Sequence, residues 1–92
     1  MVTEFSKKFL KLVAEIQKKD PILFGKIQKQ LATFQKDPQH PSLRLHKLSG
    51  VQADAWSISL NMSVRMLFYY RLEKAEKRAV FFTVGKHEEV YK

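Results

Sequence analysis

One stretch of the sequence decides the fold: W-S-I-S-L-N-M-S-V-R-M-L-F-Y-Y-R-L, residues 56–72. In its first part, Trp56, Ile58 and Leu60 alternate with two serines, which is the period of a half-buried β-strand. Residues 64–72 predict a second strand with apolar side chains on both faces. Because a central strand shows this pattern when helices cover one side of a sheet, we expect a helix layer elsewhere in the chain.

Residues on either side of this stretch extend the sheet. Residues 78–84 predict a third strand after the polar connector 73–77, and residues 44–48 predict the first strand of an antiparallel meander. A short strand also fits residues 1–5. The strand phases predict that Trp56, Phe68 and Phe82 are largely buried. Exposure of two of them would mean that the phases are wrong, since a slip of one residue moves a side chain to the other face.

Two helices precede the sheet. Apolar side chains recur at helical spacing over residues 6–19, with Ser6 as the N-cap. Asp20 and Pro21 end this helix and begin a second one, which continues to about residue 36, before two prolines at positions 38 and 41. Residues 1–92 therefore predict a single α+β domain, with an antiparallel pair of N-terminal helices packed on a four- to five-stranded antiparallel sheet.

The chain is strongly basic. Its 17 lysines and arginines exceed its nine acidic residues by 8. This balance favours RNA, DNA or an acidic protein as a partner, through phosphate contacts and counterion release. Lysines along helices are also typical of a solvated face, which is the competing interpretation for each single lysine.

Several classes of protein are excluded or disfavoured. The chain has no cysteine, and its three histidines lack the short spacing of metal ligands, so we expect no cofactor and no metal. Its apolar runs fall far short of the ~18 residues that a membrane helix needs. Lysines and a glutamate interrupt the N-terminal region where a signal peptide would be apolar, so we expect a cytoplasmic protein.

Four short runs carry a resemblance to a known family: H-K-L-S-G at 46–50, A-W-S-I at 55–58, V-R-M-L-F-Y at 64–69 and T-V-G-K-H-E-E-V-Y at 83–91. In order and spacing, residues 41–91 resemble the RelE/ParE toxin superfamily, and the preceding helices agree in architecture. The resemblance implies a RelE-like fold that binds messenger RNA on its concave sheet face, usually within the ribosome. It also implies cleavage without a metal, by attack of a ribose 2′-hydroxyl on the neighbouring phosphorus.

That reaction needs a base, a cation beside the phosphorane oxygens and an acid for the departing 5′-oxygen. Arg65 matches the strand arginine of the family, whose planar fork would hold the scissile phosphate. Strand alternation places Arg65 on the face opposite Met66 and Phe68. The competing interpretation is a surface salt bridge to an acid such as Glu73.

Three further residues are candidates for the chemistry. His87 matches the basic residue before the terminal aromatic of the family and titrates in the right range for an acid or base, or it is an exposed tail histidine. His46 aligns with a histidine of some ribosome-dependent members, or it packs at a strand edge. Tyr91 matches the terminal aromatic and would stack on a base, or it closes the core. Contacts to the RNA backbone are expected from Arg44, Lys47 and Lys86.

One departure from the family concerns the general base. Neutral Ser57 and Ser59 stand where several potent members carry lysines or acids, so the resemblance leaves the base unassigned. His40, between two prolines, is given no role. The resemblance implies a cognate acidic antitoxin as partner, besides messenger RNA and the ribosome. Two alternatives stay open: a ParE-like inhibitor of DNA gyrase without nuclease activity, and an inactive RNA-binding relative.

Overall fold

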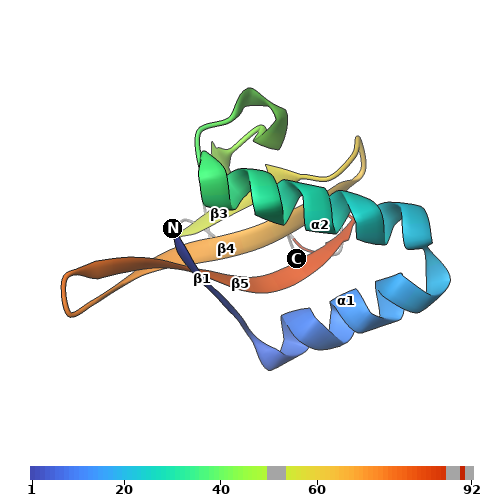
Figure 1. Cartoon of the computed structure of the whole chain (residues 1–92), viewed down its shortest axis with the longest axis horizontal. Coiled ribbons are helices and arrows are strands. Elements are labelled where there is room, and N and C mark those ends of the chain that lie inside the picture. The colour runs from blue at the N-terminus through green and yellow to red at the C-terminus, as the bar shows by residue number, and fades with distance from the viewer. Residues whose placement is uncertain (50–53, 87–89, 91–92) are drawn as a thin grey trace.

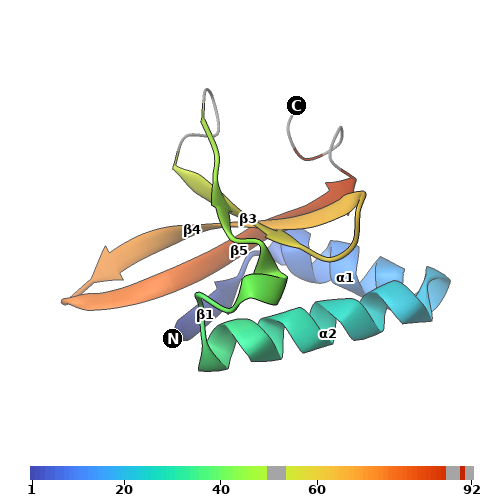
Figure 2. The same cartoon turned by 90° about the horizontal axis from the view of Figure 1, so that it is seen from above.

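The computed structural model describes residues 1–49, 54–86 and 90. Two helices lie on one face of a five-stranded sheet, which confirms the expected α+β architecture (Figures 1 and 2). Along the chain the elements are β1 (Val2–Phe5), α1 (Lys7–Lys19), α2 (Pro21–Lys36), the single 3-10 turn η1 (Pro41–Leu43), β2 (His46–Lys47), β3 (Ala55–Ser59), β4 (Val64–Glu73) and β5 (Glu76–Lys86).

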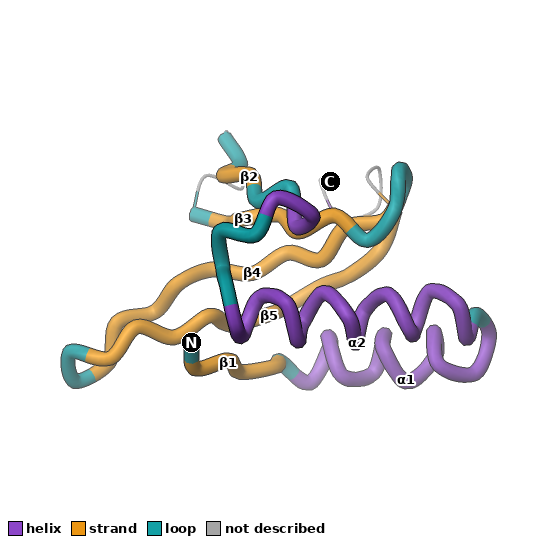
Figure 3. Tube along the Cα trace, turned by 45° about the horizontal axis from the view of Figure 1, so that its top comes forward, coloured by secondary structure: helices purple, strands orange, loops and turns teal. Residues whose placement is uncertain are grey.

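The helices begin where the sequence places their caps. The Ser6 hydroxyl accepts a hydrogen bond from the backbone N–H of Phe9 at 3.0 Å, and an Asp20 carboxylate oxygen accepts one from Leu23 at 3.1 Å. Pro21 is the first residue of α2, where its missing N–H costs nothing. The two helices lie side by side and run in opposite directions (Figure 3). Neither helix, among the residues that the structure describes, is long and apolar enough to cross a membrane.

The sheet has the strand order β1-β5-β4-β3-β2. Four of its strands form the expected antiparallel meander, but β1 pairs with β5 in parallel, from Val2 beside Arg78 to Phe5 beside Phe81. The sheet is therefore mostly antiparallel, and the parallel pair at this edge was not predicted from the sequence. β1 leads into α1 and has no hairpin to β5, so no turn sets the relative direction of these two strands.

The core lies between the helices and the sheet. The ring of Phe34 from α2 meets the ring of Phe68 at 5.0 Å and that of Phe81 at 5.7 Å, both edge-on, and all three side chains are fully buried. The expected burial is confirmed for Phe68, whereas Trp56 and Phe82 are half-buried. Phe82 falls at a β-bulge: Phe68 pairs with Phe81 and the preceding residue of β4 pairs with Thr83, so Phe82 has no cross-strand partner.

The other face of the sheet carries no helix among the described elements, and we call it the helix-free face. Side chains alternate along β4, so Met66 and Phe68 face the helices while Arg65 lies on the helix-free face, as predicted. Two rows of paired residues cross this face: Ser59, Arg65 and Gly85 form one row, and His46, Ser57, Leu67 and Thr83 form the next.

Candidate functional site

Arg65 is held in place by neutral oxygen atoms. Its Nη1 donates hydrogen bonds to the hydroxyl of Ser59 at 3.1 Å and to the backbone carbonyl of Asn61 at 2.8 Å. Among the described residues, no carboxylate lies within ion-pair distance of Arg65. The alternative salt bridge to Glu73 is not formed, because Glu73 pairs with Arg71 at 3.4 Å. The charge of Arg65 is therefore oriented without a described counter-ion.

The turn between β3 and β4 explains this orientation. The side-chain oxygen of Asn61 accepts hydrogen bonds from the backbone N–H groups of Ser63 and Val64, both at 2.8 Å. The N–H of Leu60 donates to the carbonyl of Val64 at 3.0 Å and closes the turn. An asparagine that bonds the backbone two residues ahead fixes a tight turn, and here this fixes the Asn61 carbonyl that Arg65 uses.

Arg65 shares a pocket of about 420 Å³ with Arg44, and the other lining residues are Ser59, Asn61 and Met62. Arg44 follows η1 in the left-handed region, with φ 48° and ψ 48°, and its N–H donates to the carbonyl of Pro41 at 3.1 Å. Two arginines from distant parts of the chain thus line one pocket, and none of its described lining residues is acidic. Planar guanidinium groups suit paired phosphate oxygens, so the pocket is chemically matched to an anion.

The structure brings some of the remaining predicted residues to this region. His46 is exposed and pairs with Ser57, which places it on the helix-free face, one row from Arg65. With strands about 4.8 Å apart and a rise of about 3.3 Å per residue, the two Cα atoms are roughly 12 Å apart. Lys86 ends β5 and pairs with the core residue Val64, so strand alternation places it on the helix side, next to the Arg65–Gly85 pair but not on the same face. His46 therefore shares the helix-free face with Arg65, whereas Lys86 does not.

Other predicted residues are not brought together there. Lys47 pairs with Trp56, faces the helix side and holds its ammonium 6.0 Å from the centre of the Trp56 ring, so it does not share the face of Arg65. His87 and Tyr91 lie outside the described residues. In residues 1–49, 54–86 and 90, no group of three histidine or acidic side chains is arranged to hold a metal ion.

Two residues with a structural part at the site escaped the sequence interpretation. His40, which was given no role, caps η1, because its Nδ1 accepts a hydrogen bond from the N–H of Ser42 at 3.1 Å. Gln30 is buried on the apolar stripe of α2, between Ile27 and Phe34. A polar residue at the spacing of a buried helical face is the signal that would have revealed it.

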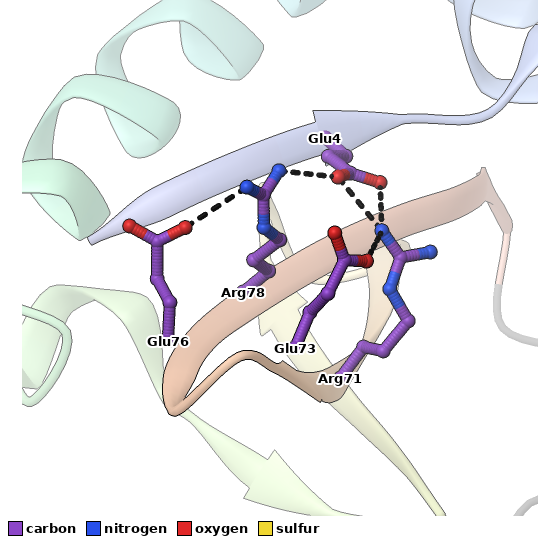
Figure 4. A network of polar contacts seen from close by, with 5 residues as sticks. All are labelled: Glu4, Arg71, Glu73, Glu76 and Arg78. Carbon is purple, nitrogen blue, oxygen red and sulfur yellow. Dashed lines mark hydrogen bonds and ion pairs between the residues drawn. The ribbon is translucent and has the colours of Figure 1, made fainter.

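A second set of arginines lies at the far end of the helix-free face (Figure 4). Arg71 donates from Nη2 to both carboxylate oxygens of Glu4, each at 2.8 Å, and Arg78 donates to Glu4 at 2.7 Å. Arg78 also pairs with Glu76 at 2.9 Å, and Arg71 with Glu73. The hydrogen bond from Arg78 and the charge of Arg71 hold the pKa of Glu4 below its usual value, and the same bond raises the pKa of Arg78.

Comparison with known proteins gives matches in structure only. No family model matches the sequence, and no curated protein matches it. The fold is similar to a YoeB/ParE toxin from Agrobacterium tumefaciens, with a TM-score of 0.79 and 16% identity over 95% of this chain and 99% of that one. It is also similar to YafQ from E. coli, with a TM-score of 0.75 and 18% identity over 98% and 97% of the two chains.

A third similar structure is the toxin–antitoxin complex of YoeB and YefM from Staphylococcus aureus, with a TM-score of 0.72 and 16% identity over 95% of this chain and 97% of that one. These likenesses extend over nearly the whole chain. The chain therefore has the fold of these toxins, which is the RelE-like fold that the sequence resemblance implied.

Proposed function

We propose that this protein is the toxin of a toxin–antitoxin pair and an endoribonuclease that cuts messenger RNA on the ribosome, without a metal, and so inhibits translation. One observation carries the proposal: Arg44 and Arg65 line a single pocket to which no acidic side chain of the described residues contributes. This pocket involves the helix-free face of a fold shared with YoeB and YafQ. A phosphodiester is the anion that a basic protein of this fold is expected to meet.

In the proposed reaction, the 2′-hydroxyl of a ribose attacks the adjacent phosphorus and the 5′-oxygen of the next nucleotide leaves. Arg65 holds the non-bridging oxygens and stabilises the negative charge that grows on them. Its orientation by Ser59 and the Asn61 carbonyl precedes binding, so no reorganisation is needed during the reaction. Arg44 and Lys86 contact neighbouring parts of the RNA backbone and position the strand.

The proton transfers are assigned to histidines. His87 is proposed as the acid that protonates the leaving oxygen, and Tyr91 as a base-stacking residue, both on the strength of the sequence resemblance. His46 is proposed as the second acid–base group, because it is exposed on the same face as Arg65. Ser59 is a poor base, because its hydroxyl donates to the Asn61 carbonyl at 3.0 Å and accepts from Arg65. We therefore assign acceptance of the 2′-hydroxyl proton to a histidine, because an imidazole titrates near neutral pH.

The proposed partner is an acidic antitoxin. The similar S. aureus structure is a complex of YoeB with YefM. An acidic, partly disordered segment would bind a chain of net charge +8 and cover its anion pocket. The proposal places the protein in the cytoplasm, where messenger RNA and ribosomes meet.

The test is expression in cells, followed by mapping of messenger RNA 5′ ends and a gyrase-cleavage assay on the same cultures. New 5′ ends that vanish in the Arg65→Ala variant are expected. Gyrase-linked DNA breaks with intact messenger RNA would instead establish the gyrase-inhibitor alternative. Harmless expression with neither effect would establish the inactive alternative.

A further inference from the structure

Gln30 occupies a position where the core would accept an apolar side chain. It lies on the buried stripe of α2, between Ile27 and Phe34, and only 8% of its surface is exposed. A buried amide is tolerated only where its hydrogen-bonding groups find partners. The Nε2 of Gln30 finds two, the backbone carbonyls of Ser42 and Ser59, both at 3.0 Å.

The two acceptors belong to the two halves of the anion pocket. Ser42 lies in η1, the turn that ends at Arg44. Ser59 ends β3, lines the pocket and accepts a hydrogen bond from Arg65. One amide group therefore connects the segment that carries Arg44 to the residue that orients Arg65.

Arg44 needs such support. Its φ of 48° lies in the left-handed region, which residues other than glycine adopt at a cost in energy, so surrounding contacts must maintain it. The His40 cap holds one side of η1, and Gln30 attaches the same turn to the sheet. Without the amide, η1 would keep its own internal bond but lose its hydrogen bond to the helix that also holds Ser59.

We infer that Gln30 is a positioning residue, which sets the spacing of Arg44 and Arg65 so that both bind one RNA strand at the same time. This inference rests on the proposed function, because it assigns the pocket to an RNA backbone. Gln30 itself contacts no RNA and acts through Arg44.

The first experiment compares Gln30→Met with Gln35→Met. Methionine fills the same space but donates no hydrogen bond. Gln35 is a matched control on the same helix, since its Nε2 donates at 2.8 Å to the hydroxyl of Thr3 in β1, away from the pocket. The probe is a single-stranded 2′-O-methyl RNA, which binds but lacks the attacking hydroxyl. Its affinity is measured at several salt concentrations, with folding checked by circular dichroism.

Loss of one arginine–phosphate contact reduces the slope of log affinity against log salt by about 0.7 for a single strand. We expect that reduction in Gln30→Met and the parent slope in Gln35→Met. Cleavage of unmodified RNA should fall roughly 10- to 100-fold in Gln30→Met, since a shift of about 1 Å in a positioning group has effects of that size. If Gln30→Met does not fold, Gln30→Asn replaces it, because the shorter amide cannot reach both carbonyls.

A double-mutant cycle separates positioning from mere stability. In an Arg44→Ala background, Gln30→Met should change neither the salt slope nor the cleavage rate further. Equal effects of Gln30→Met with and without Arg44 would overturn the inference.

Failure of the inference and failure of the proposed function give different results. RNA binding with a slope that depends on Gln30, but no cleavage by the parent, would retain the inference and reject the nuclease. If the parent cleaves RNA but the folded Gln30 variant has the same salt dependence of RNA affinity as the parent, the nuclease is retained and the inference is rejected. Absence of salt-dependent binding by the parent would reject both.

Discussion

The two ends of the helix-free face use arginine in opposite ways. At one end, Arg71 and Arg78 bind the carboxylates of Glu4, Glu73 and Glu76 (Figure 4). At the other end, Arg65 binds only neutral oxygens among the described residues. An arginine paired with carboxylates offers little to a further anion, whereas one oriented by neutral groups keeps its charge. Counter-ions, more than residue type, therefore distinguish a structural arginine from a candidate ligand.

The largest expected effect is the loss of this available charge. Arg65→Ala should lower RNA cleavage by on the order of 10²–10³, as removal of one transition-state donor does. Arg65→Lys should recover only part, because an ammonium is a point charge. The measurement is single-turnover cleavage of ribosome-bound messenger RNA, with Arg71→Ala as the control that keeps near-parent cleavage once folded. Full activity of Arg65→Ala together with full activity of His87→Ala would sink the mechanism.

The next largest effect on cleavage is expected from the loss of proton transfer by His87. His87→Gln should bind RNA as the parent does but cleave it roughly 10²–10⁴-fold more slowly, the usual contribution of a general acid. If His87 acts as the acid, it must be protonated, so the parent rate should fall as pH rises through about 6.5, the ordinary range of imidazole. The pH profile of single-turnover rates checks this. If the pH profile of the parent has a second ionisation that is absent from the profile of His46→Ala, both histidines take part.

A smaller effect is expected from the neutral partner of Arg65. Ser59→Ala removes one hydrogen bond to the guanidinium, which contributes about 1 kcal/mol, so cleavage should fall roughly fivefold. The Asn61 carbonyl still holds Arg65 in this variant. Thermal unfolding serves as the control for a general loss of stability. A loss as large as that of Arg65→Ala would mean that Ser59 itself touches the RNA.

The smallest effect on cleavage is expected at the opposite end of the face. Glu4→Gln should leave the cleavage rate near that of the parent but change the response to acid. Because folding lowers the pKa of Glu4, its contribution to stability is present above its ordinary pKa of 4.5 and is lost as pH falls through the lower folded value. The free energy of unfolding, measured with urea from pH 7 to pH 2, should decrease less with falling pH in the variant than in the parent. The same decrease in both proteins would contradict this assignment.

Local signals in the sequence predicted most of the fold. The Ser6 and Asp20 caps determine where the helices begin, and the alternation along residues 64–72 determines which face carries Arg65. The parallel pairing of β1 and the bulge at Phe82 depend on contacts between distant strands, which no local period encodes. A single sequence therefore predicts elements and faces better than edge pairing and register.

The candidate site was predicted less completely, for a related reason. Arg65 was selected from the sequence resemblance and its face from the local strand alternation, whereas the arginine that shares its pocket depends on the left-handed turn at Arg44. Gln30 donates hydrogen bonds to the carbonyls of Ser42 in that turn and of Ser59, and it is distant in sequence from Ser59. The face of Lys47 could not be predicted, because a two-residue strand has too few positions to show its phase.

The parallel edge strand also bears on synthesis. Ser6 at the end of β1 donates from its hydroxyl to the carbonyl of Phe82, across 76 positions of the chain. At about 5–20 residues per second, translation leaves the first strand unpaired for several seconds, until β5 has emerged. The β1–β5 pair, which adjoins the Glu4 network, therefore cannot form until β5 has been made.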